Sequence, residues 1–194
     1  MNDAQGFRRR AVMRLAAVAA ASRTLPSRAQ DAPRDTQVKA AYLLKFFTFV
    51  EWPDSAFPRP DSPVNIGVLG DDQLLRDLRE LARPIEGRPV VVTRLNPNES
   101  VAGLQIVYGR FASASRAADY MSAVPEGVLT VADSDGIHPR GSVLSFFIQD
   151  GKVRFAASVQ SAAKQRLRLS SRLLSVARSV QGRLDPWPGG PWLA

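Results

Sequence analysis

One segment, residues 37–52 with the closing letters KFFTFVEW, constrains the fold of this chain most. Its polar residues Lys45, Thr48 and Glu51 recur every third position and nearly all others are apolar, which predicts a helix buried on most sides. A helix of this length spans about 24 Å, too short to cross a bilayer. We expect Pro53 to end it, because the residue before a proline is pushed out of the α region.

Short apolar strands alternate with helical segments after this helix. The pattern predicts strands at 64–69, 88–95, 104–109 and 127–133, and helices at 72–82 and 113–123. The continuous apolar run in 88–95 is typical of a covered sheet. The order β-α-β-β-α-β predicts an α/β fold: a three-layer sandwich with a central, mostly parallel sheet and helices on both faces.

The C-terminal third changes pattern. Residues 143–158 predict a β-hairpin, because Asp150-Gly151 is a preferred two-residue turn between alternating strands. Two helices are expected next, one starting at Ser158 and one capped by Ser170. The second helix is expected to present one apolar face, made of Leu173, Val176, Ala177 and Val180. The tail 182–194, rich in Pro and Gly, is predicted to be disordered.

The N-terminal residues 1–29 have the pattern of an export signal. A basic stretch precedes a short apolar run and the small-x-small site Ser27-Arg28-Ala29. Arg9-Arg10 resembles a twin-arginine signal, so the Sec and twin-arginine routes both stay open. We expect cleavage near Ala29, a linker at 30–36, one domain at 37–181 and a mature chain in the periplasm with no membrane span.

The net charge of +8 first suggests a nucleic-acid partner. However, six of the 26 Lys and Arg residues precede position 30, and without that stretch the net charge is +3. A basic face remains between positions 151 and 184, where eight Lys and Arg residues occur without an acid: Lys152, Arg154, Lys164, Arg166, Arg168, Arg172, Arg178 and Arg183. It is either a solvated face or a surface for an acidic protein or anionic lipid. It has no interleaved aromatics to stack bases, so we expect no nucleic acid.

No set of residues with catalytic chemistry is found. Cys is absent, which excludes disulfides, thiolate zinc sites and a Cys nucleophile. The single His138 lies among turn residues and is expected to be a solvated loop residue, without partners for a metal or a Ser-His-Asp triad. Asp71 and Asp72 follow a strand as in phosphate-accepting receiver domains, but the strand at 104–109 ends without an acid. We therefore expect Asp71 to cap a helix, and no catalytic, cofactor-binding or metal site.

Several stretches in order resemble the YfiR/HmsC-like family: VKAAYLLKFFTFVEWPDSAF, VNIGVLGDD, LQIVYG, GVLTVADSDGI, VLSFFIQDGKVRF and RLSSRLLSVARSV. They cover about residues 37–181. The resemblance implies that the Phe-rich helix packs on the sheet. It also implies a non-enzymatic periplasmic regulator that binds the periplasmic sensory domain of an inner-membrane diguanylate cyclase or a related sensor protein. Binding would hold the cyclase inactive, lowering cyclic-di-GMP and biofilm formation.

The chain departs from that family at two positions. Related proteins often carry cysteines where this sequence has Gly67 and Leu104. The resemblance therefore implies that a bridge has been dispensed with here, so a redox-sensing version of the mechanism is not available.

We expect the partner interface at Glu51, Trp52, Arg154, Arg168 and Arg172. For Trp52, core packing is the plainer interpretation, and for the arginines it is solvation or charge complementarity at helix ends. A homodimer stays open. An alternative function is a periplasmic module that binds a small ligand or a cell-wall fragment, with a pocket near the strand ends at Gly70 and Asp133. In the main interpretation, Asp133 caps a turn. A cytoplasmic flavodoxin-like enzyme is the weakest alternative.

Overall fold

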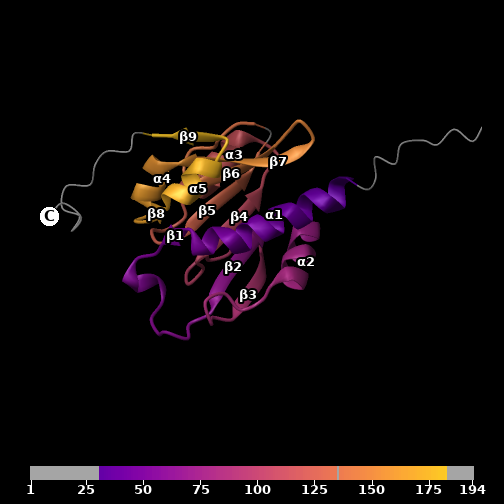
Figure 1. Ribbon diagram of the computed structural model, residues 1–194. Helices are drawn as coiled ribbons and strands as arrows, with labels where there is room; N and C mark the ends of the chain where they lie inside the picture. The colour runs from indigo at the N-terminus through magenta and orange to yellow at the C-terminus, as the bar shows by residue number, and fades with distance from the viewer. Residues whose placement is uncertain (1–30, 135, 183–194) are drawn as a thin grey trace, which may run out of the picture.

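The computed structural model describes residues 31–134 and 136–182 (Figure 1). The predicted signal peptide and the tail from residue 183 onward lie outside this part of the chain. Within the described residues, no helix combines the length and apolar content needed to span a membrane.

Seven strands form one sheet in the order β3-β2-β4-β5-β6-β7-β9. Neighbouring strands are parallel except β6 and β7, which form the antiparallel hairpin. The strands are β2 (Val64–Leu69), β3 (Val90–Leu95), β4 (Ile106–Arg110), β5 (Leu129–Asp133), β6 (Leu144–Gln149), β7 (Lys152–Ser158) and β9 (Ser179–Gln181). The predicted mostly parallel sheet with a C-terminal hairpin is confirmed. The hairpin turn has positive φ at both Asp150 (51°) and Gly151 (66°), as a type I′ turn requires.

The helices are α1 (Asp31–Thr48), α2 (Asp72–Leu81), α3 (Ala114–Ser122), α4 (Val159–Lys164) and α5 (Ser171–Val176), with a short 3-10 turn η1 (Asp54–Ala56). The four helices after α1 each begin after a side chain that accepts a hydrogen bond from a backbone N–H of the first turn: Asp71, Ser113, Ser158 and Ser170. Such caps depend only on residues close together in the sequence, and the predicted starts of these four helices are confirmed.

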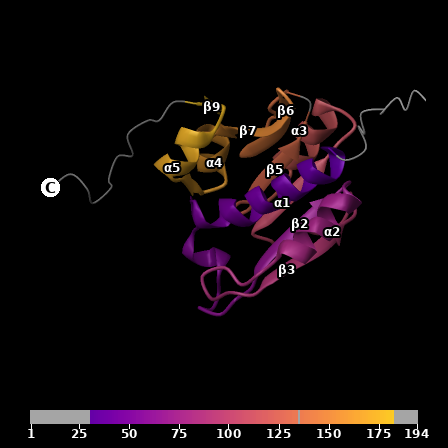
Figure 2. The ribbon, with the colours of Figure 1, turned by 45° about the vertical axis from the view of Figure 1, so that its right-hand side comes forward.

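Helices cover both faces of the sheet, and strand β4 shows how. Ile106 and Tyr108 point into the core under α1, whereas Val107 belongs to a second apolar cluster on the other face. A Cβ on Gly109 would touch Met121 of α3, so α3 packs on that second face. Figures 1 and 2 show α1 crossing the sheet with α2 beside it. The predicted three layers are therefore present.

The aromatic residues of α1 form the centre of the larger core. Phe46 is 2% exposed and its ring lies 5.6 Å from that of Phe146 and 5.0 Å from that of Phe155. Tyr42 contacts all three rings. The Phe-rich segment is thus a core helix packed on the hairpin, which places the hairpin against the N-terminal helix.

The predicted end of α1 is wrong. The helix stops at Thr48, four residues before Trp52, and it begins at Asp31, inside the segment expected to be a linker. Residues Val50–Glu51 form strand β1, which pairs with β8 (Arg168–Leu169) in a separate two-stranded sheet. Pro53 therefore follows a strand. Val50 and Glu51 adopt an extended backbone because they pair with a strand more than a hundred residues away, and local periodicity does not show such a partner.

Two further predictions are corrected. Strand β3 lies at the edge of the sheet and Val91 is 45% exposed, so this apolar run is not covered on both faces. Helix α5 ends at Val176, and Val180 belongs to β9 instead. Val176 and Val180 are exposed, so of the expected apolar face Leu173 is buried and Ala177 is partly buried. The predicted apolar face, from Leu173 to Val180, required a helix longer than the six residues of α5.

Candidate partner-binding surface

Glu51 and Arg168 face each other across the small sheet. They are register partners in β1 and β8, and the Arg168 guanidinium lies 3.3 Å from the Glu51 carboxylate. Both side chains are more than half exposed, so the ion pair adds little to stability. The structure brings together two residues that the sequence placed far apart, and both are accessible to a partner.

Trp52 follows β1 and is half-buried. Its Nε1 donates a hydrogen bond to the carbonyl of Phe47 (3.2 Å), and its ring stacks on the Phe47 ring at 5.5 Å. Phe57 meets both rings edge-on. The tryptophan therefore has a packing role, which agrees with the plainer interpretation of its sequence position. A partner contact of its exposed edge stays a prediction.

The other two predicted interface residues lie on different elements. Arg172 is exposed on α5, whose cap Ser170 donates its backbone N–H to the carbonyl of Phe49, so α5 begins beside β1. Arg154 is exposed on β7 and lies in the hairpin. The structure thus places Glu51, Arg168 and Arg172 around the β1–β8 sheet, whereas Arg154 belongs to a second surface.

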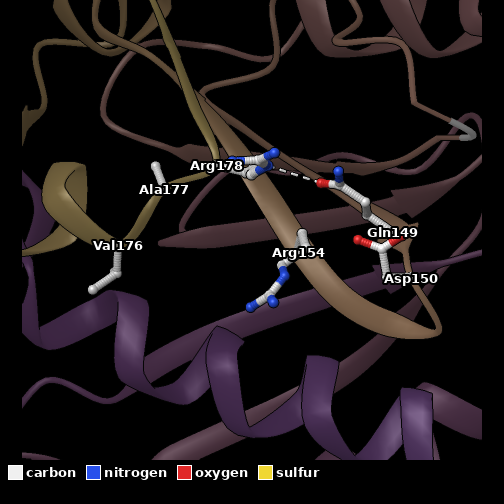
Figure 3. A pocket seen from close by; sticks show the side chains of 6 residues that line it. All are labelled: Gln149, Asp150, Arg154, Val176, Ala177 and Arg178. Atoms are coloured by element: carbon white, nitrogen blue, oxygen red, sulfur yellow. Dashed lines mark hydrogen bonds between the residues drawn. The ribbon is translucent and has the colours of Figure 1, made fainter.

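That second surface is an open depression of about 400 Å³ between the hairpin tip and the junction of α5 with β9 (Figure 3). It is lined by Gln149, Asp150, Arg154, Val176, Ala177 and Arg178. The Arg178 Nε donates to the side-chain oxygen of Gln149 (2.9 Å), which fixes one guanidinium at its rim. Apart from Arg154, none of these residues was predicted from the sequence as an interface residue, although Arg178 belongs to the predicted basic face. The charge run around Arg154 and Arg178 is the signal that pointed to this region.

The basic face is partly neutralised inside the molecule. Arg166 pairs with Glu126 (2.7 Å) and Arg168 with Glu51. In the described residues, no ion pair with a carboxylate is found for Arg154, Arg172 or Arg178. The positive charge that remains for a partner therefore lies on the hairpin, at the end of α4, on α5 and at Arg178 just before β9.

A buried polar network lies at the carboxyl ends of the parallel strands. The Lys39 ammonium of α1 donates to Asp133 at the end of β5 (2.9 Å), and the Tyr108 hydroxyl donates to the same carboxylate oxygen (2.8 Å). Arg110 at the end of β4 lies 3.4 Å from Asp71 and 3.8 Å from Asp133. Burial, and then the charges of Asp133 and Asp71, raise the pKa of Tyr108 well above its usual value, so the phenol keeps its proton and donates.

This network corrects the prediction that Asp133 caps a turn. Ligands of doubly wound folds bind where strand order reverses, here between β2 and β4. At that point the carboxylates of Asp71 and Asp133 already bind Lys39, Tyr108 and Arg110. This edge of the sheet, near Gly70 and Asp133, therefore adds no support for the alternative function of binding a small ligand. Lys39 could have been found in the sequence, since it lies on the helical stripe of Leu43 and Phe46. For Tyr108, the sequence indicated only that it belongs to an apolar strand, and nothing predicted its bond to Asp133.

His138 is also corrected. It is half-buried, its Nε2 lies 2.8 Å from the carbonyl of Ser142 and its Nδ1 lies 2.7 Å from the hydroxyl of Ser145. It holds a loop rather than facing solvent. Across residues 31–134 and 136–182, no group of three or more His, Cys, Asp or Glu side chains is arranged to hold a metal ion.

The strand order and the helices on both faces define a doubly wound α/β protein, with exposed basic surfaces next to the hairpin. A family model described as YfiR/HmsC-like matches residues 36–178, and the chain belongs to this family. No curated protein matches the chain. The family consists of periplasmic regulatory proteins rather than enzymes, and it implies a protein partner such as a sensor or a cyclase.

Proposed function

We propose that this protein is exported to the periplasm, loses its leader near Ala29, and binds the periplasmic sensory domain of an inner-membrane diguanylate cyclase. Bound, it holds the cyclase inactive and so lowers cyclic-di-GMP and biofilm formation. The observation that carries the proposal is the family match over residues 36–178, which supports a protein partner such as a sensor or a cyclase.

The surface supports a binding role. Glu51, Arg168 and Arg172 are exposed around the β1–β8 sheet, and Arg154 is exposed on the hairpin. Both regions stand on rigid supports, because β1 continues from the core helix α1 and the hairpin packs against the same helix through Phe146 and Phe155. Interfaces built on such elements lose little conformational entropy when a partner binds.

Inhibition would follow from a shift of populations. The protein would bind the inactive state of the sensory domain more tightly than the active state, and the inhibition is limited by that difference in affinity. Coupling energies of this kind are about 1–3 kcal/mol, which corresponds to about a 5–150-fold bias. A signal that weakens the complex would release the cyclase without any chemistry on this protein.

The test is deletion of the gene in its own bacterium, with cellular cyclic-di-GMP measured by mass spectrometry. We expect cyclic-di-GMP and surface attachment to rise, and a plasmid copy of the gene to restore both. A second strain that also lacks the partner cyclase should show no rise. Unchanged cyclic-di-GMP in the single deletion, with every cyclase gene intact, would refute the proposal.

A further inference from the structure

We propose that the depression between the hairpin and the α5–β9 junction is the docking site for an acidic segment of the protein partner, one that carries an apolar side chain beside a carboxylate. This inference rests on the proposed function in one respect, namely that the partner is a protein. It assigns a location and a chemistry that the family relationship does not supply.

Two guanidinium groups give the depression its charge. Arg154 is exposed on β7 and pairs with no described carboxylate, and Arg178 is held by the neutral amide of Gln149, which leaves its charge uncompensated (Figure 3). Guanidinium groups bind carboxylates through parallel N–H donors, with both geometric and electrostatic selectivity. Two such groups in one hollow favour an anionic side chain as the occupant.

An exposed apolar side chain lies beside this charge. Val176 is 66% exposed, the largest value among the large apolar side chains of the described residues, and it lines the depression together with Ala177. Ile148 on β6 is also exposed, but it is the register partner of Val153 and points to the face of the hairpin opposite Arg154, so it does not line the depression. An occupant that covers Val176 therefore needs an apolar group.

The mixed lining distinguishes between classes of occupant. Asp150 lies in the depression with the arginines, and its carboxylate would oppose a uniformly anionic lipid surface. If a second copy of this chain docked through the same site, the same patch of both copies would meet face to face. The two unpaired arginines of one copy would then lie opposite the two of the other, and their like charges would repel. A protein segment with alternating acidic and apolar side chains satisfies both the arginines and Val176.

The first test is charge reversal in the full-length mature chain. The variants Arg154→Glu and Arg178→Glu are compared with Arg76→Glu, which makes the same charge change on the exposed face of α2, where the Arg76 side chain bonds no described residue other than Gln73. The probe is the purified periplasmic domain of each inner-membrane diguanylate cyclase of the same bacterium. We expect each depression variant to weaken binding at least tenfold and Arg76→Glu to change it less than twofold. Unaltered melting temperatures confirm that the variants fold.

The second test identifies the occupant in cells. A photo-reactive benzoylphenylalanine replaces Val176, or Val91 on the opposite edge of the sheet as the control. Cross-linked peptides are then identified by mass spectrometry. We expect Val176, and not Val91, to capture a protein segment with two or more acidic residues near the cross-link.

The outcomes separate this inference from the proposed function. A cyclase domain that binds but responds equally to Arg154→Glu and Arg76→Glu overturns the docking site and leaves the proposed function intact. Capture of an acidic segment from another envelope protein supports the docking site and refutes the cyclase as partner. Cross-links from Val176 only to lipid, to a second copy or to no protein overturn the docking site.

Discussion

At the residue scale, His138 shows how a single side chain can become sensitive to pH. The carbonyl of Ser142 can only accept, so Nε2 carries the proton of the neutral ring and Nδ1 accepts from the Ser145 hydroxyl. Burial lowers the pKa of His138, and the hydrogen bond to Ser142 offsets part of this effect. The folded protein therefore holds the ring neutral at pH values where the unfolded chain begins to take up a proton.

We predict that stability falls as the pH is lowered through about 6.5, the ordinary pKa of histidine in an unfolded chain. The contribution of His138 is complete above that value and is lost as the pH approaches the lower pKa of the folded state. One proton limits the slope to about 1.4 kcal/mol per pH unit. Urea unfolding at pH values between about 5.5 and 7.5 measures it. The variant His138→Asn should flatten the slope; an unchanged slope would exclude His138 as its source.

At the element scale, the packing of β2 against β3 and the residues just before β4 depends on a glycine, Gly67, which has no side chain. A Cβ on Gly67 of β2 would lie 2.5 Å from the Cδ1 of Leu95 and 2.7 Å from the Cδ1 of Leu104. The space beside Gly67 is filled by the side chains of Leu95 and Leu104. Gly67 and Leu104 are therefore direct neighbours, and packing holds these segments together.

We predict that Gly67→Ala destabilises the protein by about 1–3 kcal/mol, the usual cost of overpacking a filled core. Combining it with Leu104→Ala should cost clearly less than the sum of the two single changes, since the shortened side chain makes room for the new methyl group. Urea denaturation of the four proteins of this cycle supplies the coupling energy. Strictly additive effects would show that the two side chains do not compete for space.

At the scale of the whole molecule, the Lys39–Asp133 pair ties the N-terminal helix to the carboxyl edge of the sheet. The two residues are 94 positions apart and their side chains are 8% and 9% exposed. A buried pair is weak evidence for net stabilisation, but removal of one partner leaves an uncompensated buried charge. The pair therefore specifies where α1 lies as much as it strengthens the fold.

We predict that Asp133→Asn costs about 3–5 kcal/mol, because Lys39 then has no carboxylate partner in the interior. Lys39→Met should cost less, since Asp133 keeps the Tyr108 hydroxyl and the Arg110 guanidinium. The double variant should be more stable than the sum of the two losses predicts. Equilibrium urea unfolding checks all three proteins.

The exposed ion pair between Arg94 and Asp72 provides the control. Its side chains are 56% and 57% exposed, so Arg94→Met should change the unfolding free energy by less than about 1 kcal/mol. An effect of Asp133→Asn no larger than that of Arg94→Met would show that the buried network contributes nothing to the position of α1.

The features that could be predicted from the sequence alone depend on residues close together in the chain. The four helix caps, the Asp150-Gly151 turn, the β-α-β-β-α-β order between residues 64 and 133 and the buried character of Phe46 each depend on spacing or local hydrogen bonding, and the structure confirms them. The likeness to the YfiR/HmsC-like family, carried by six stretches in order, was also visible in the sequence and is confirmed.

Only the tertiary structure decided the features that join distant residues. Val50 and Glu51 became a strand because β8 pairs with them, His138 became a loop anchor because Ser142 and Ser145 return to it, and Asp133 became the partner of Lys39 because α1 crosses the strand ends. The depression at Arg154 and Arg178 exists because the hairpin and the α5–β9 junction meet. Local propensities are weak compared with the free energy of pairing strands and satisfying buried charges, so pairs distant in the chain override them.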